Sequence, residues 1–254
     1  MDRSRRMFLQ SAGLLAVGSL LSGCTVSESK RSDRLSKPNV IYILADDLGY
    51  GDLSCYGQKH FATPNLDRLA QEGMRFTQHY AGSTVCAPSR CCLMTGLHTG
   101  HAQIRGNMGV QPEGQYPLAE GTYTLPRMFQ DAGYVTGAFG KWGLGATGNS
   151  GDPNRQGFDV FFGYKCQTQA HFYYPKSLWR NDQKVELPDN DPQTRQGVYS
   201  HDLIMREALK FIQDNQDKPF FMYLTATIPH AELAVPESDL AQFRGKYPEK
   251  PFAG

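Results

Sequence analysis

The amino-acid sequence predicts an α/β domain whose central sheet is mainly parallel and is flanked by helices. Short apolar runs occur at residues 39–45 (N-V-I-Y-I-L-A), 134–139 and 219–225 (P-F-F-M-Y-L-T), with amphipathic segments between them. This alternation is typical of a parallel sheet, because the connection between two parallel strands usually contains a helix. The 254 residues, 40% of them hydrophobic, suffice for one large domain or two small ones, and no repeat or linker is visible after residue 37.

The first strand is expected to be buried on both faces, since residues 39–45 form a nearly continuous apolar run rich in β-branched side chains. A helix should follow Thr63, which suits an N-cap because Pro64 would occupy the first helical position. Gly73 is a stop signal for that helix. These signals predict a strand, a connection and a short helix in that order.

Three more helices are predicted further along the chain. One begins near residues 86–89 and runs to Met94, and another covers residues 124–132 with Gly133 at its end. The longest amphipathic segment, residues 201–215, predicts the third. The apolar runs that follow the second and third of these helices are expected to be buried strands.

Charge and cysteine content restrict the function classes. The formal net charge of +1 lacks the clustered basic excess of a nucleic-acid-binding surface, so no nucleic-acid partner is expected. Of the six cysteines, adjacent Cys91 and Cys92 are expected to pack within a helix rather than to form a bridge. The spacing of Cys86, Cys91 and Cys92 also differs from that of structural zinc sites.

The N-terminus predicts an exported bacterial protein. Residues 4–9 (S-R-R-M-F-L) resemble the twin-arginine motif, and the apolar stretch 12–21 is too short for a transmembrane helix. Residues 21–24 (L-S-G-C) resemble a lipobox in which Cys24 is lipidated, so residues 1–24 are expected to be a signal peptide. An ordinary signal peptide with a chance cysteine is the alternative. Residues 25–37 suit a flexible tether, so we expect a periplasmic, outer-membrane or cell-surface lipoprotein attached only by its lipid.

Polar side chains follow each of the three predicted strands. Asp46 and Asp47 come after the first strand, Lys141 after the second and His230 after the third. In an open α/β sheet, ligands bind beyond the carboxyl ends of the strands. We therefore expect these side chains to share a single site.

The adjacent aspartates point to a metal. Two carboxylates at one strand end repel each other and require a counter-charge, which a hard divalent cation such as Ca²⁺ or Mg²⁺ supplies. The alternative is that Asp47 caps a turn with Gly49 while Asp46 stays solvated.

Residues 86–96 (C-A-P-S-R-C-C-L-M-T-G) are the most informative stretch for function. At the start of the helix predicted there, Cys86 would lie beside backbone N–H groups that favour an anion. Arg90 follows one helical turn later, where it can orient Cys86 or a modified form of it. Unmodified, Cys86 would be either a buried thiol or an activated nucleophile.

This stretch resembles the signature of the type I sulfatases, C-x-P-S-R followed by x4-T-G, at every specified position. Residues 46–57 match the family's D-D-x-G-x-G-D-L-x-x-Y-G motif, and the lysine and proline–histidine segments match as well. The resemblance covers residue 38 to the end and implies the alkaline phosphatase-like sulfatase fold. It also implies hydrolysis of a sulfate ester with a bound divalent ion, usually calcium.

The resemblance implies a role for each site residue. A maturation enzyme converts Cys86 to Cα-formylglycine, whose aldehyde hydrate is the nucleophile. Residue 86 binds the metal together with Asp46 and Asp47. Lys141 binds the sulfate group and the hydrate, while His230 contacts the sulfate or the leaving-group oxygen.

Two departures from the family pattern bear on completeness. Gly143 stands where many relatives have the histidine of G-K-W-H-L-G, so one donor is missing or supplied from elsewhere. The family's second metal-ligand pair and second lysine have no counterpart after His230, so residues 38–254 are expected to be the N-terminal part of a sulfatase catalytic domain. These residues alone are expected to turn over slowly or not at all.

The substrate is expected to be a sulfated carbohydrate or an aryl sulfate ester. Residues 164–179 are rich in aromatic and polar side chains suited to a sugar, with Gln167 and His171 as candidate contacts. The alternative for this segment is a surface loop whose aromatic rings pack on the sheet. Two other functions stay open, namely a phosphate or phosphonate monoester hydrolase of the same superfamily and a non-catalytic, surface-tethered glycan-binding remnant.

Overall fold

The computed structural model describes residues 37–230 and 232–247. The predicted signal peptide, the lipidation at Cys24 and all but the last residue of the predicted tether lie outside these residues. The chain from Pro38 onward forms one compact unit. Within the described ranges, none of the helices is long and apolar enough to cross a membrane.

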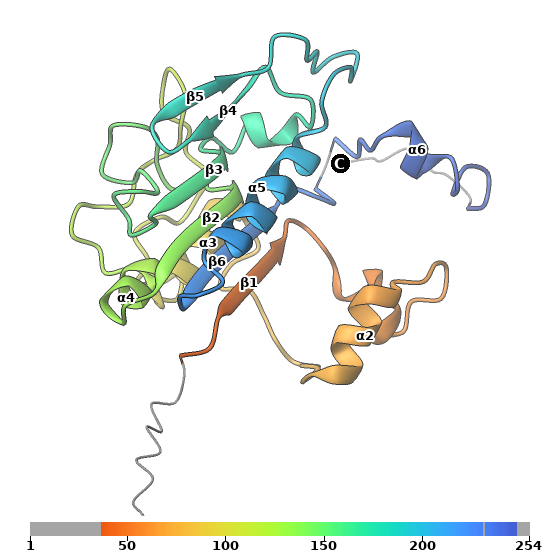
Figure 1. The fold of residues 1–254 in the computed structure, drawn as a ribbon, viewed down its shortest axis with the longest axis horizontal. Coiled ribbons are helices and arrows are strands. Elements are labelled where there is room, and N and C mark those ends of the chain that lie inside the picture. The colour runs from red at the N-terminus through yellow and green to blue at the C-terminus, as the bar shows by residue number, and fades with distance from the viewer. Residues whose placement is uncertain (1–36, 231, 248–254) are drawn as a thin grey trace, which may run out of the picture. The chain divides into compact units, whose positions relative to one another are not determined.

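A mixed, mainly parallel sheet forms the centre of the unit (Figure 1). Its strands lie in the order β1-β6-β2-β3-β4-β5, and the first four of these are mutually parallel. The antiparallel hairpin of β4 and β5 forms the opposite edge from β1. The strands are β1 (Val40–Ala45), β2 (Val135–Lys141), β3 (Val160–Tyr164), β4 (Ser177–Arg180), β5 (Gln183–Glu186) and β6 (Phe220–Ala226).

Helices cover both faces of this sheet (Figure 1). The α-helices are α2 (Pro64–Glu72), α3 (Cys86–Thr95), α4 (Leu125–Asp131), α5 (Ser200–Asp214) and α6 (Glu237–Leu240), and the 3-10 turns are η1 (Tyr50–Asp52), η2 (Ser54–Tyr56) and η3 (Gln169–His171). The four helices predicted from sequence are α2 to α5. Pro64 and Gly73 bound α2 as their residue types predict.

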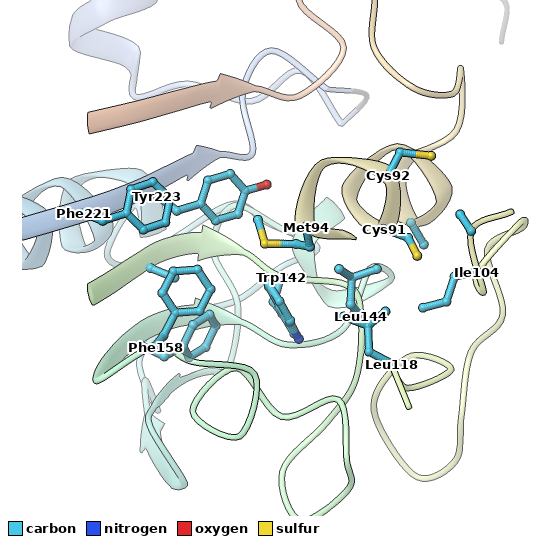
Figure 2. Close-up of a cluster of buried hydrophobic side chains, with 14 residues drawn as sticks. Cys91, Cys92, Met94, Ile104, Leu118, Trp142, Leu144, Phe158, Phe221 and Tyr223 are labelled. Atoms are coloured by element: carbon cyan, nitrogen blue, oxygen red, sulfur yellow. The ribbon is translucent and has the colours of Figure 1, made fainter. Parts of the chain in front are cut away.

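Alternate side chains of the central strands pack into two separate hydrophobic cores, one on each face of the sheet. On the side of α3 and α4, Phe221 and Tyr223 of β6 pack with Trp142 and Phe158 (Figure 2). On the other side, Phe220, Met222 and Leu224 pack against α5. Cys91 and Cys92 are buried free thiols of α3, which confirms that they pack rather than form a bridge. This two-sided packing explains why the β6 run is apolar at every position.

The prediction that the first strand is buried on both faces is wrong. Tyr42 and Leu44 pack against the core on the α3 side, but Ile41 and Ile43 are 46% and 58% exposed. β1 is an edge strand, and α5 packs on β2, β3 and β6 without reaching it. An apolar run therefore marked a strand correctly but could not tell an edge strand from a central one.

Three strands were not predicted. β3 is a five-residue run, and β4 and β5 are four residues each, too short for a periodic pattern to be clear. Asn181, at the turn between β4 and β5, has a φ of 51°, a left-handed conformation that asparagine tolerates. The Asn181-Asp182 pair was thus the available signal for the hairpin.

Glycines allow the carboxyl ends of the central strands to approach one another. Gly140 of β2 has a φ of 115°, and a Cβ there would lie 1.9 Å from the carbonyl oxygen of Thr225 in β6. A Cβ at Gly163 of β3 would lie 2.0 Å from the carbonyl oxygen of Gly140. Backbone atoms cannot yield as a flexible side chain can, so only glycine fits at these two positions.

We predict that Gly140→Ala lowers the free energy of unfolding by about 3 kcal/mol or more, because it combines a rare φ with a clash against backbone. Urea denaturation followed by circular dichroism measures this. Gly106→Ala is the control, since a Cβ there meets no atom within 4 Å, and it should change stability by less than about 1 kcal/mol. Equal losses in the two variants would contradict the packing argument.

Candidate active site

Three strand ends and the start of one helix meet at a single edge of the sheet. Asp46 directly follows β1, Lys141 ends β2, and the backbone N–H of Asp46 donates to the carbonyl of Ala226 at the end of β6 (3.1 Å). Cys86 is the first residue of α3. The parallel registers of these strands bring their carboxyl ends level, as the sequence predicted for a single site.

A buried ion network forms the floor of the site. Lys141 Nζ donates to Asp46 Oδ2 at 2.6 Å, and Arg90 Nη2 lies 3.3 Å from Asp46 Oδ1. Asp46 is 6% exposed, Arg90 2% and Lys141 0%. The alternative in which Asp46 stays solvated is therefore wrong. The counter-charge that the aspartates require comes, for Asp46, from two side chains of the protein itself.

Arg90 also ties the strand ends together. Its Nη1 donates to the carbonyl of Lys141 and to the hydroxyl of Thr225, and that hydroxyl itself donates to the Lys141 carbonyl at 3.0 Å. Arg90 Nε and Nη2 have no hydrogen-bond partner among the described residues, so Arg90 makes no hydrogen bond to Cys86. A planar guanidinium can serve several acceptors at fixed angles, which suits this role.

The two cations control the charge state of Asp46. Burial alone would raise the pKa of this carboxyl, but the neighbouring Arg90 and Lys141 outweigh burial and hold its pKa below the usual value. Asp46 is therefore ionised at neutral pH.

Asp47 differs from Asp46 in its surroundings. It has a φ of 62°, and its side chain is 59% exposed. Its Oδ2 lies 3.4 Å from His230 Nε2. The turn after β1 is held by Asp52, whose Oδ2 accepts from the backbone N–H of Gly49 at 2.6 Å. Asp47 thus faces His230, and Asp52 takes the turn role considered for Asp47.

Cys86 lies close to both Asp46 and His230. One ligand atom from each of these three residues lies within 4.8 Å of the others. The next backbone N–H of α3, that of Ala87, donates to Asn107 Oδ1 at 3.0 Å. Asn107 was not predicted, because a side chain 20 residues away that caps a helix start leaves no local pattern. A pocket of about 220 Å³ opens beside Asp46, Asp47, Cys86 and Arg90.

Two histidines from different loops stack at the site. The rings of His171 and His230 have centroids 4.5 Å apart and an interplanar angle of 25°. Burial, followed by the charge of Lys141 and of His230, lowers the pKa of His171. Tyr173 Oη donates to the carbonyl of His230 at 2.8 Å, which fixes the loop after β6.

The segment 164–179 divides into packing residues and site residues. Tyr164, Tyr173 and Tyr174 are at most 8% exposed, so these rings pack within the fold as the alternative for this segment expected. His171 reaches the site through His230. Gln167 is buried and forms no hydrogen bond to any described residue, including the site residues.

Comparison with known proteins places the chain among sulfatases. A family model described as Sulfatase matches residues 38–252. The N-acetylgalactosamine-6-O-sulfatase of Bacteroides thetaiotaomicron is 39% identical over 186 residues, which are 69% of this chain and 35% of that protein.

Two solved structures have the same fold over part of their length. Ps i-CgsB in complex with k-i-k-neocarrahexaose is 30% identical with a TM-score of 0.68, over 82% of this chain and 49% of that one. BT4656 in complex with its substrate D-glucosamine-2-N,6-O-disulfate is 27% identical with a TM-score of 0.67, over 85% of this chain and 40% of that one. The predicted alkaline phosphatase-like sulfatase fold is confirmed, and the chain spans less than half the length of these relatives.

We predict that Asp46→Asn lowers the free energy of unfolding by about 3–5 kcal/mol, because it leaves the buried charges of Arg90 and Lys141 without a counter-ion. Urea denaturation of the metal-free protein measures the loss. Asp47→Asn, at a half-exposed carboxylate, should cost less than about 1 kcal/mol. A small loss for Asp46→Asn would mean that the network does not hold the strand ends together.

Proposed function

This chain belongs to the sulfatase family, and we propose that it hydrolyses a sulfate ester at the site around Cys86. The observation that carries the proposal is the convergence, at one sheet edge, of Cys86 at a helix start with the buried Asp46–Lys141 pair and with His230. Such a site offers positive charge and N–H groups to an oxyanion and places a modifiable side chain beside them.

We propose a sulfated carbohydrate as the substrate class. A similar protein from Bacteroides thetaiotaomicron is an N-acetylgalactosamine-6-O-sulfatase, and similar structures contain a disulfated glucosamine or a neocarrahexaose. Identities of 27–39% over part of the chain support the class of substrate and leave the sugar and the position of its sulfate for experiment.

The donor set would fit a hard divalent ion under two conditions. Asp46 and Asp47 have carboxylate oxygens, which calcium and magnesium prefer. Asp47, however, contacts His230 and lies outside the group of Asp46, Cys86 and His230 whose ligand atoms are within 4.8 Å of one another, so its side chain would have to turn toward Asp46. The sulfur of an unmodified Cys86 suits neither ion. An oxygen at position 86, as in formylglycine, would complete the set. Lys141 and Arg90 together carry one positive charge more than Asp46 neutralises, so a bound divalent ion would leave the site cationic, and Asp47 and an anionic substrate would lower that charge.

Formylglycine at position 86 would supply a hydrated aldehyde as nucleophile, and the metal would polarise the sulfuryl oxygens. The formation of formylglycine requires a maturation enzyme, which we propose as a partner. Because twin-arginine export carries folded proteins, the half-buried Cys86 would have to be modified in the cytoplasm, before folding closes the site.

The other side chains of the site bind the sulfate group, position the strand ends and donate a proton. The ammonium of Lys141 has three N–H groups, and Asp46 accepts one of them, which leaves donors for the sulfuryl oxygens and for residue 86. Arg90 is a positioning residue, since its hydrogen bonds and ion pair hold Asp46 and the strand ends. We assign His230 to the sulfate or to the leaving-group oxygen, to which it can donate a proton.

The first test follows residue 86 itself. In protein produced together with a formylglycine-generating enzyme, mass spectrometry of the peptide across Cys86 should show loss of the sulfur atom. Turnover by these residues alone is expected to be slow, so relative rates are compared: sulfate should be released from an aryl sulfate faster than phosphate from an aryl phosphate or phosphonate from its monoester. Chelation should abolish the release and calcium should restore it.

Cys86→Ala is the matched control and should release no sulfate while it keeps its fold, because Cys86 is half-buried and belongs to neither buried core cluster. Faster release of phosphate would favour the phosphate or phosphonate hydrolase. Binding of sulfated glycans by modified protein, without any sulfate release, would favour the non-catalytic glycan-binding function.

We also propose that the protein is exported and anchored to a membrane through a lipid at Cys24. Support comes from the sequence alone, namely the S-R-R-M-F-L motif and the L-S-G-C segment. The wild type should incorporate labelled palmitate and Cys24→Ala should not. Cell fractionation should recover both proteins outside the cytoplasm. Export without labelling of the wild type would support an ordinary signal peptide.

A further inference from the structure

Gln167 is a buried amide without a partner. It lies in the loop after β3, is 4% exposed, and neither Nε2 nor Oε1 has a hydrogen-bond partner among the described residues. An unsatisfied buried amide costs free energy of about 1–3 kcal/mol, so such groups are rare unless a ligand or water completes them.

Gly143 makes the space that Gln167 occupies. Its φ is 77°, and a Cβ at this position would lie 2.0 Å from Gln167 Nε2 and 2.7 Å from its Cδ. Any other residue at position 143 would displace the amide. The glycine and the glutamine are therefore coupled, and the amide fills the volume that a side chain at 143 would take.

The pair adjoins residues that belong to the active site. Gly143 is two residues beyond Lys141, and its backbone N–H donates to the carbonyl of Lys165 at 3.2 Å, which extends the alignment of β2 and β3 past their ends. Four residues after Gln167, His171 stacks on His230. The loop that carries Gln167 therefore contacts the segment just after β2 through Lys165 and contacts His230 through His171.

The same loop is held rigidly on the other side of Gln167. Lys165 Nζ is 2.7 Å from Asp152 Oδ2 and both side chains are buried. Cys166 Sγ lies 3.7 Å from the carbonyl oxygen of Gly114. These contacts fix the backbone before Gln167, so little conformational entropy remains to be lost when its amide meets a ligand.

We propose that Gln167 is a substrate-binding residue whose amide, packed against Gly143, contacts the ester group when substrate binds. Nε2 donates to an oxygen of the sulfate group, and Oε1 accepts from a neighbouring hydroxyl of the sugar. An amide has both a donor and an acceptor, and a sulfated sugar presents the matching pair. This assignment rests on the proposed function and adds a contact that distinguishes a sulfated sugar from a bare anion.

Gln156 provides a comparison within the chain. It is also buried, at 1% exposed, and its Oε1 has no partner among the described residues, but its Nε2 donates to the carbonyl of Ser150 at 2.6 Å. Gln156 has a structural role, and its removal should cost stability. Gln167 makes no such bond, so its replacement by an apolar side chain of similar length should cost none.

The test uses Gln167→Met in the full chain with inorganic sulfate and a sulfated monosaccharide as probes. Thermal unfolding without ligand should occur at the same or a higher temperature than in the wild type. Calorimetry should find sulfate binding weakened about tenfold, the loss of one hydrogen bond to a charged group, and the sulfated monosaccharide should lose more.

Two further variants separate a binding role from packing. Gln156→Met should lower the unfolding temperature and leave sulfate affinity unchanged. Gly143→Ala should weaken sulfate binding as Gln167→Met does, and the double variant should be no weaker than either single one, because both changes remove the same contact.

Wild-type affinity for sulfate and the sugar in a folded Gln167→Met variant would overturn the assignment of Gln167 and leave the proposed function intact. A wild type that neither binds sulfate nor releases it from any ester would overturn the proposed function and this inference together. Lower stability of Gln167→Met with unchanged affinity would assign the amide to packing.

Discussion

The buried ion network of Arg90, Asp46 and Lys141 is the interaction on which the rest of the site depends. It places one carboxylate between two cations where almost no solvent reaches, and such a group is stable only when all partners are present. Because its members come from the ends of β1 and β2 and from α3, the network requires these elements to meet. The packing of the strand ends and the charge balance of the site therefore depend on the same three side chains.

Close approach of the strand ends makes that network possible. Gly140 and Gly163 remove the side chains that would hold β2, β3 and β6 apart. The same device recurs at Gly143, where the absent side chain admits the amide of Gln167. The two uses differ in outcome, since backbone fills the space at Gly140 whereas an unpartnered polar group fills it at Gly143. The first closes the structure and the second leaves hydrogen-bonding capacity for a ligand.

Charge balance links the fold to the chemistry of the family. The two cations of the network exceed the charge of Asp46 by one, so the floor of the site is cationic and favours an anion. The half-exposed Asp47 lies beside His230, whose ring stacks on that of His171. Such an arrangement suits the cleavage of an ester that carries its own negative charge.

The sequence by itself determined that β1, β2 and β6 become strands and that α2 to α5 become helices, because apolar periodicity, prolines and glycines act locally. It also identified Cys86, Lys141 and His230 as candidate site residues, since each lies in a local sequence motif. Only the tertiary structure decided that Ile41 and Ile43 face solvent, that Arg90 binds Asp46 and strand ends, and that Gln167 lies against Gly143. These outcomes depend on strand order and on contacts between distant residues, and no local pattern encodes either.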